Sequence, residues 1–195
     1  YTRFLATVAT ANLETRCGDP TPVAEVDLAD LPDAAQRYMR FMGVVGRPRD
    51  WSFRARFSGR FRRGPGSSWM PCEAWQYNTA SPIARVFHMR VKLAHLLPMV
   101  ARDTYLRGHG RMVGKILDLI TGVDGTGDEF DLGELVTYLD DAVLLAPSML
   151  LGPHVTWHEV DDTSFDVTLT DAGRSVTGRV CVDQPSGPLA AGHPG

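Results

Sequence analysis

Side chains with chemical capability are densest between residues 103 and 111. Asp103, Tyr105 and Arg107 stand at alternate positions, so on a strand they project from one face. A carboxylate and a guanidinium on one face can form a bidentate ion pair or hold a polar head group. A hairpin with structural charges would show the same pattern, and His109, between two glycines, is expected to be an exposed turn residue. We take Asp103, Tyr105 and Arg107 as ligand-binding candidates.

A second set of polar side chains recurs at helical spacing. Glu134, Tyr138 and Asp141 stand at i, i+4 and i+7, which places them on one helix face. Two carboxylates facing Arg107 or Arg111 can shift one another's pKa and act as an acid and base pair. A helix cap at Glu134 and a solvated Asp141 explain the same pattern without catalysis. We keep these three residues and Trp157 as ligand-binding candidates, and we assign no catalytic residue.

Other chemistries lack their motifs. The six histidines have no HxH or HExxH spacing, and Cys17, Cys72 and Cys181 form no CxxC pair. Neither a metal site nor a disulfide framework is therefore expected. No GxSxG, GxxxxGK[ST] or strand-linked GxGxxG is present, which removes support for a serine nucleophile and for a phosphate loop. We expect no metal and no cofactor.

The elements that must position these residues are mainly strands. From Trp51 to Arg62 apolar and polar residues alternate strictly, which predicts a half-buried antiparallel strand with an arginine-lined wet face. The glycines around His109 predict a tight turn between two further strands. The other segments expected to be strands are 69–77, 86–93, 102–107, 111–119, 155–160, 164–170 and 175–182, with turns at 63–68, 122–127 and 171–174.

Two segments have helical spacing. Residues 31–43 combine an early proline, apolar residues at helical spacing and a terminal glycine, which predicts a short amphipathic helix. Residues 131–145 predict the principal helix, in which Asp131 and Glu134 resemble a capping box and Pro147 sets the end. Residues 1–30 are expected to be a loosely ordered lead-in, and 184–195 an irregular tail.

Strand pairs interrupted by one helix predict an α+β fold. We expect a mainly antiparallel, curved sheet, a meander or half-barrel, with the principal helix packed on it and a short N-terminal helix. The absence of βαβ alternation argues against a Rossmann or TIM arrangement. The chain has 195 residues, 44% of them hydrophobic, so a single domain over 31–183 is expected.

Charge and hydropathy limit the partners. A net charge of −3 gives no overall basic field, so overall attraction to nucleic acid or to an anionic bilayer is not expected, and we expect no nucleic acid partner. No apolar run reaches the length of a membrane span. The chain begins at Tyr1 and ends in a turn-rich stretch, which suggests a fragment with a truncated C-terminus. We expect it to be soluble as given, either cytoplasmic or anchored through a missing N-terminus, in an unknown oligomeric state.

A series of short motifs runs along residues 31–182. They are LP at 31–32, RY at 37–38, GVVG at 43–46, WMP at 69–71, Asp103 followed by GHGRM at 108–112, GEL at 133–135 with YL at 138–139, Pro147 and Trp157. In these motifs the chain resembles a bacterial family of unknown function that is common in actinobacteria.

The chain departs from that family pattern on the principal helix. Thr137 stands where the family has an arginine, and Asp141 where it has a glutamate, which weakens any role for that charged helix face. By analogy, the sheet pattern looks like the half-barrels of lipoprotein carriers and related lipid-binding proteins. This resemblance implies a fold and no particular ligand.

The sequence leaves the function unknown and supports three hypotheses. The first is non-enzymatic binding of a lipid-like or other apolar small molecule in a half-barrel cavity lined by strand aromatics, which would equally fill an ordinary core. The second is an enzyme that uses Asp103, Glu134 and Asp141. The third is an interaction module whose arginine-lined strand face meets an acidic partner, and neutralising acids beside the arginines would argue against it.

Overall fold

The structure is a computed structural model that describes residues 1–11, 13, 20–62, 64–93, 97–117, 120–183 and 187–192. Its internal contacts divide the chain into two compact units. Unit 1 comprises residues 1–14 and 53–134, and unit 2 comprises residues 15–52 and 135–195.

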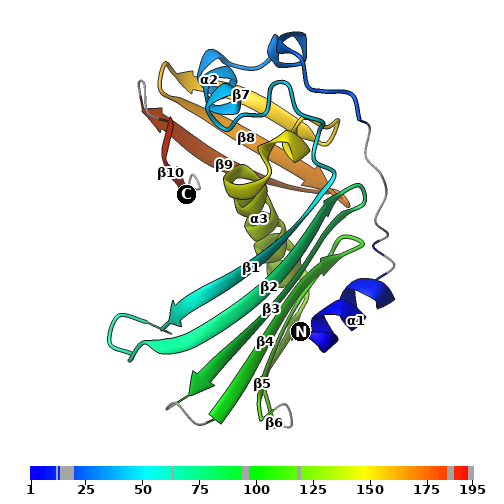
Figure 1. Cartoon of the computed structure of the whole chain (residues 1–195), viewed down its shortest axis with the longest axis vertical. Helices are drawn as coiled ribbons and strands as arrows, with labels where there is room; N and C mark the ends of the chain where they lie inside the picture. Colours follow the sequence, from blue (N-terminus) through cyan, green and yellow to red (C-terminus); the bar gives the residue numbers. More distant parts are fainter. Residues whose placement is uncertain are drawn as a thin grey trace. The chain divides into compact units, whose positions relative to one another are not determined.

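Unit 1 is built on a curved, antiparallel six-stranded sheet whose strands follow one another in chain order (Figure 1). This confirms the expected α+β class and the expected meander. The strands are β1 (Ser52–Phe61), β2 (Met70–Ala80), β3 (Ile83–Leu93), β4 (Leu97–Leu106), β5 (His109–Ile116) and β6 (Ile120–Thr126).

The strand register divides this sheet into two faces of different chemistry. Asn78, Arg85 and Tyr105 are paired in one row across β2, β3 and β4, and they face the helix α3 (Asp128–Leu145). The next row along β3 contains Val86, which faces the helix α1 (Thr2–Thr10). Because neighbouring residues on a strand point to opposite sides, we call these the α3 face and the α1 face.

Helix α1 lies in the region where a loosely ordered lead-in was expected. Its Phe4 and Val8 are four residues apart, so both project from one side of the helix. They pack with Tyr77, Ala84 and Val86 in a buried apolar cluster on the α1 face. Burial of each such large side chain contributes about 1.5–3 kcal/mol, so a short helix is held on the sheet mainly by its apolar side.

Glycines on the α3 face serve close packing. The positive φ angles of the β4–β5 turn fall at Arg107 and Gly108, so Gly110 lies within β5. A Cβ at Gly110 would stand 2.1 Å from the backbone oxygen of Phe130 on α3. Residues 122–127, expected to be a turn, are mostly strand β6, because Gly125 makes room for the Phe130 ring.

Strand β1 is less covered than its alternation predicts. It is an edge strand, since it comes first in the sheet order, and a strand at an edge lacks a neighbour on one side. Phe57, expected on the buried face, is 41% exposed.

The helices of the described residues fall short of the requirements of a membrane span. None of them combines the length and the apolar character that a bilayer crossing needs.

Unit 2 contains a second antiparallel sheet and three short helical segments. Its elements are η1 (Glu25–Leu28), α2 (Asp33–Phe41), η2 (Pro147–Leu150), β7 (Val155–Asp161), β8 (Ser164–Asp171), β9 (Arg174–Asp183) and β10 (Gly187–Gly192). The strand order is β10-β9-β8-β7, and β10 lies in the stretch expected to be an irregular tail. Tyr38 of α2 and Trp157 of β7 both pack on Phe165 of β8, with ring centroids 5.6 and 5.5 Å from it.

Candidate functional site

A buried ion pair joins the α3 face of the sheet to the first turns of α3. Nη1 of Arg85 lies 2.8 Å from Oε2 of Glu134, and the two side chains are 5% and 7% exposed. Arg85 occupies the alternating register of β3 that also holds Phe87 and Val91, so the strand carries its charge into the apolar side. Removal of two charges from water is costly, so the pair adds little net stability while both partners are present, although loss of either one would leave a buried charge unmatched.

Asp103 lies on the same face near this pair, and its carboxyl is partly buried. Burial raises the pKa of the Asp103 carboxyl above its ordinary value, and the charge of Arg85 partly opposes that rise. Among the described residues, Oδ1 of Asp103 has no hydrogen-bond partner. Asn78, which pairs with Arg85 across the ladder, likewise has a buried Nδ2 with no partner there, although its Oδ1 accepts from Gln76 at 3.1 Å.

Asp131 links α3 to β5 and is not the helix cap that the capping-box pattern predicted. The helix begins earlier, at Asp128, so Asp131 lies inside its first turn. Oδ1 of Asp131 accepts a hydrogen bond from the backbone N–H of Gly110 at 2.7 Å. Oδ2 lies 3.4 Å from Nδ1 of His109, whose side chain is exposed as expected.

Unit 1 brings together three of the seven predicted ligand-binding candidates. Asp103, Tyr105 and Glu134 share the α3 face around Arg85, and Tyr105 is fully buried. Arg107 is separated from them because the strand ends at Leu106 and Arg107 turns away at a φ of 56°.

The other three candidates belong to unit 2. Tyr138 is buried, and burial together with the charges of Asp171 and Asp141 raises the pKa of its hydroxyl. Trp157 packs on Phe165 in the core of that unit. Glu134 and Tyr138 share a helix face as predicted, but α3 contributes them to different units.

The α1 face holds a pocket of about 640 Å³ between α1 and the sheet. One wall is the helix and the other comes from the β2–β3 turn, β3, β4 and the residue that follows β4. None of the described residues that line it is acidic. They are Arg3, Ala6, Thr7, Thr10, Ala11, Leu13, Pro82, Ala84, Arg102, Leu106 and Arg107.

Positive charge gathers around this apolar pocket. Arg3, Arg102 and Arg107 all line it, from α1, β4 and the β4–β5 turn. Burial and the charge of Arg3 lower the pKa of Arg102, so the two guanidinium groups disfavour one another. A ligand anion between them would reduce that repulsion.

His88 lies on the same face beneath α1. Its Nε2 is 3.3 Å from Oγ1 of Thr7, and the ring of Phe4 stands edge-on to it at 5.6 Å. Burial, the charge of Arg102 and the amino terminus lower the pKa of His88 to about 4. His88 is therefore neutral at physiological pH and adds no further charge to the pocket wall.

The sequence contained signals for residues that the predictions missed. Arg85 stands in the alternation that continues through Phe87 and Met89, and an arginine in an apolar register indicates a buried charge. The strand was expected to begin one residue later, so Arg85 was left out. Phe4, Leu5 and Val8 have helical spacing within the segment taken as a lead-in, and Arg3 lies beside them.

The described residues contain no group of three or more His, Cys, Asp or Glu that could hold a metal ion. Comparison with known proteins adds one match. A model of a family of unknown function, DUF6544, covers residues 21–189, which excludes α1. No curated protein and no solved structure matches the chain.

Proposed function

Because the chain belongs to DUF6544, a family whose function is unknown, we propose a function from the structure of unit 1: it binds a lipid-like molecule with an anionic head group. The observation that carries this proposal is the pocket beneath α1, with its apolar walls and three arginines. The proposal keeps the lipid-like ligand expected from the sequence and places it on the α1 face.

The size of the pocket supports a small-molecule ligand. Pockets for such ligands are about 300–1,000 Å³ and are mostly apolar with a few placed polar groups, and this one is about 640 Å³. Ala84, Leu106 and Leu13 offer apolar contact to a hydrocarbon chain, while the exposed Arg107 offers charged hydrogen-bond donors to a carboxylate or phosphate. The absence of acids among the described lining residues favours an anion over a cation.

The test compares three probes that share one twelve-carbon chain. Laurate carries an anionic head group, dodecanol a neutral one and dodecyltrimethylammonium a cationic one. Isothermal titration calorimetry below the micelle concentration should give the tightest binding for laurate, because only its carboxylate pairs with the arginines. Dodecanol should bind more weakly by at least roughly tenfold, as one charged hydrogen bond is worth about 1.5–3 kcal/mol, and the cation should not bind.

Two matched variants locate the binding site on α1. Thr10 lines the pocket and is exposed, so Thr10→Trp should fill the space and abolish laurate binding. Ala9 is also exposed on α1 but does not line the pocket, so Ala9→Trp should bind laurate as the unmodified chain does. Equal affinity for laurate in the two variants, or equal affinity of the unmodified chain for all three probes, would overturn the proposal.

A second candidate function is proton transfer by Asp103. It is favoured by the unpartnered Oδ1 and by the raised pKa of this carboxyl. Infrared difference spectra between the unmodified chain and Asp103→Asn should show a protonated carboxyl band at a pH where free aspartic acid is ionised. An ionised band throughout that range would remove this candidate.

A further inference from the structure

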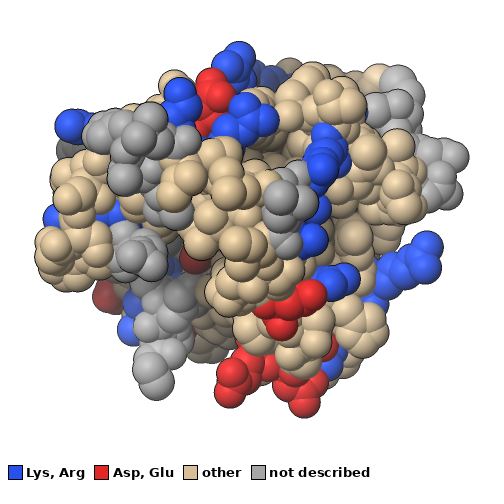
Figure 2. Space-filling model, turned by 90° about the horizontal axis from the view of Figure 1, so that it is seen from below, with Lys and Arg blue, Asp and Glu red and all other residues tan. Residues whose placement is uncertain are grey.

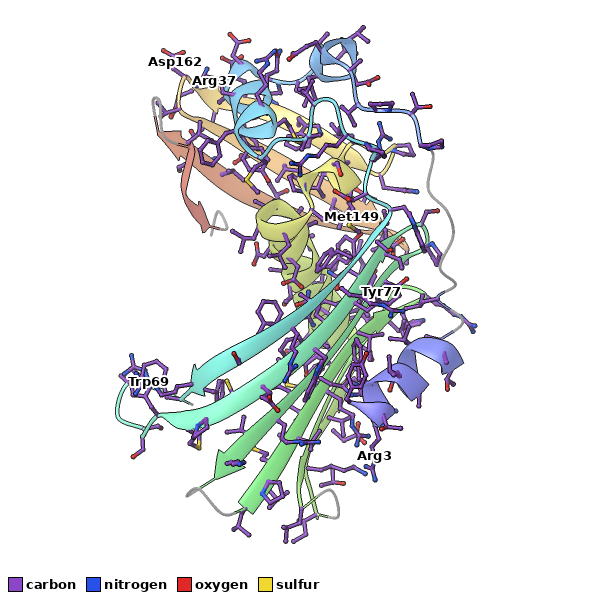
Figure 3. All side chains as sticks on the ribbon, viewed as in Figure 1. Arg3, Arg37, Trp69, Tyr77, Met149 and Asp162 are labelled. Carbon is purple, nitrogen blue, oxygen red and sulfur yellow. The ribbon has the colours of Figure 1, made fainter. Side chains whose placement is uncertain are left out.

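The α1 face continues beyond the pocket into an exposed basic patch, which we define as Arg60, Arg62, Arg90 and Lys92 together with Trp69. Arg62 lies over the Trp69 ring at 4.6 Å, and Arg90 lies 5.9 Å from the Trp75 ring. All four cationic residues are exposed, and Trp69 is 50% exposed. Figure 3 shows Trp69 at the outer end of the β1–β2 hairpin.

The acid that pairs with Arg90 across the ladder, Glu73, is engaged by another arginine: it binds Arg56 at 3.0 Å. Within the part of the chain that the structure describes, no ion pair involves the four cations of the patch. Figure 2 shows separate groups of basic side chains in the upper and right parts of the face that it presents, with acidic ones mainly at its lower edge. The patch is therefore locally positive although the chain as a whole carries −3.

We infer that the basic patch docks on an anionic membrane surface. Exposed lysines and arginines are attracted to anionic lipid head groups, and tryptophan side chains favour the boundary between head groups and hydrocarbon. This inference rests on the proposed function, because the membrane would be the source of the amphipathic anion that the pocket binds. It names the partner surface from which the chain would take that ligand.

The arrangement of the aromatic rings favours a membrane over a nucleic acid. Single-stranded nucleic acids bind proteins by stacking bases on open aromatic faces. Guanidinium groups lie over one face of Trp69 and of Trp75. The positive charge is thus presented outward while ring faces are occupied, which suits contact with a layer of phosphates more than base stacking.

The experiment is flotation of the full chain with lipid vesicles. Vesicles of phosphatidylcholine mixed with phosphatidylglycerol should carry the chain upward at low salt, and vesicles of phosphatidylcholine alone should not. Added salt should release it, because exposed charges are screened within about a Debye length. Failure to float with the anionic vesicles, or tighter binding to a single-stranded oligonucleotide at the same salt, would overturn the inference.

A pair of double variants separates the patch from net charge. Arg60→Glu with Arg62→Glu should weaken binding to anionic vesicles by more than roughly tenfold, given the attraction of each basic residue to such a surface. Arg47→Glu with Arg49→Glu changes net charge equally at exposed residues outside the patch and should bind as before. Equal losses in both would contradict docking through the patch, and circular dichroism should show that both variants fold.

The two proposals fail separately. If the pocket is wrong and the patch is right, Thr10→Trp and the unmodified chain will both float with anionic vesicles although neither binds laurate. If the patch is wrong and the pocket is right, the Arg60 and Arg62 double variant will bind laurate normally, and the unmodified chain will not float.

Discussion

The two faces of the six-stranded sheet handle charge in opposite ways. On the α3 face, Arg85 and Glu134 are buried and paired, and the neighbouring Asp103 is held at a raised pKa. On the α1 face, the arginines are more exposed, lie over aromatic rings or border a pocket. A buried charge must be paired within the protein, whereas a charge at the surface can bind a charged group of a ligand. The difference indicates that the α3 face fixes the fold and that the α1 face is available for binding.

Removal of the buried arginine should have the largest effect. Arg85→Met leaves Glu134 buried without its ion-pair partner, and loss of one partner of such a pair costs about 3–5 kcal/mol. Urea unfolding followed by circular dichroism measures the loss. Arg111→Met breaks the exposed pair with Asp124 and should change stability little. Similar losses in both variants would remove the contrast between the faces.

Acid should destabilise unit 1 through His88. Its folded-state pKa of about 4 lies below the ordinary 6.5, so the unfolded chain binds the proton more tightly. Stability is therefore lost as the pH falls from 6.5 to 4, by up to about 3 kcal/mol. His88→Gln should flatten the unfolding free energy across this range, while His154→Gln, at an exposed position, should leave the slope unchanged. An unchanged slope in His88→Gln would show that burial beneath α1 does not govern this residue.

A methyl group at Gly110 should separate α3 from the sheet. The added Cβ would stand 2.1 Å from the Phe130 oxygen, so Gly110→Ala should cost about 1–3 kcal/mol. Gly114→Ala, on the same strand and face, meets Val123 at an ordinary 3.6 Å and should cost less. Thermal unfolding of the two variants compares them directly. Equal melting temperatures would mean that α3 can shift at no cost.

The smallest effect should come from Asp103, with a sign opposite to that of His88. A raised folded-state pKa means that the folded chain binds the proton more tightly, so stability falls as the pH rises above the ordinary value of 3.8. Asp103→Asn cannot ionise, so its unfolding free energy should gain on that of the unmodified chain as the pH rises through this range. A difference in unfolding free energy that is independent of pH would show that burial does not raise the pKa of Asp103.

Strong local periodicity accounts for most of the fold that could be predicted. The alternation in β1 and the helical spacing of α2 each appear within a dozen residues, so the local sequence pattern was sufficient to place these two elements. Strand β6 was missed because Gly122 and Gly125 indicate a turn in sequence, whereas Gly125 is needed by the Phe130 ring. Helix α1 was missed because its apolar side is short, and that side is buried only by packing against the sheet cluster that contains Tyr77.

The candidate site was harder to predict than the elements that carry it. Even spacing correctly grouped Asp103 with Tyr105, but the turn at Arg107 ended the strand and removed that residue from the group. Helical spacing likewise placed Glu134 and Tyr138 on one face, yet contacts assign them to different units. Spacing predicts direction within one element, and it does not predict where that element ends or what it meets.

The sequence by itself determined the strand and helix periods and the antiparallel class, because these depend on neighbours within a few residues. The tertiary structure decided which face each helix covers, that Arg85 meets Glu134 and that Arg3 joins Arg102 and Arg107 around one pocket. Those contacts join residues far apart in the chain. They are selected by packing and by the need to pair buried charge, which no local pattern contains.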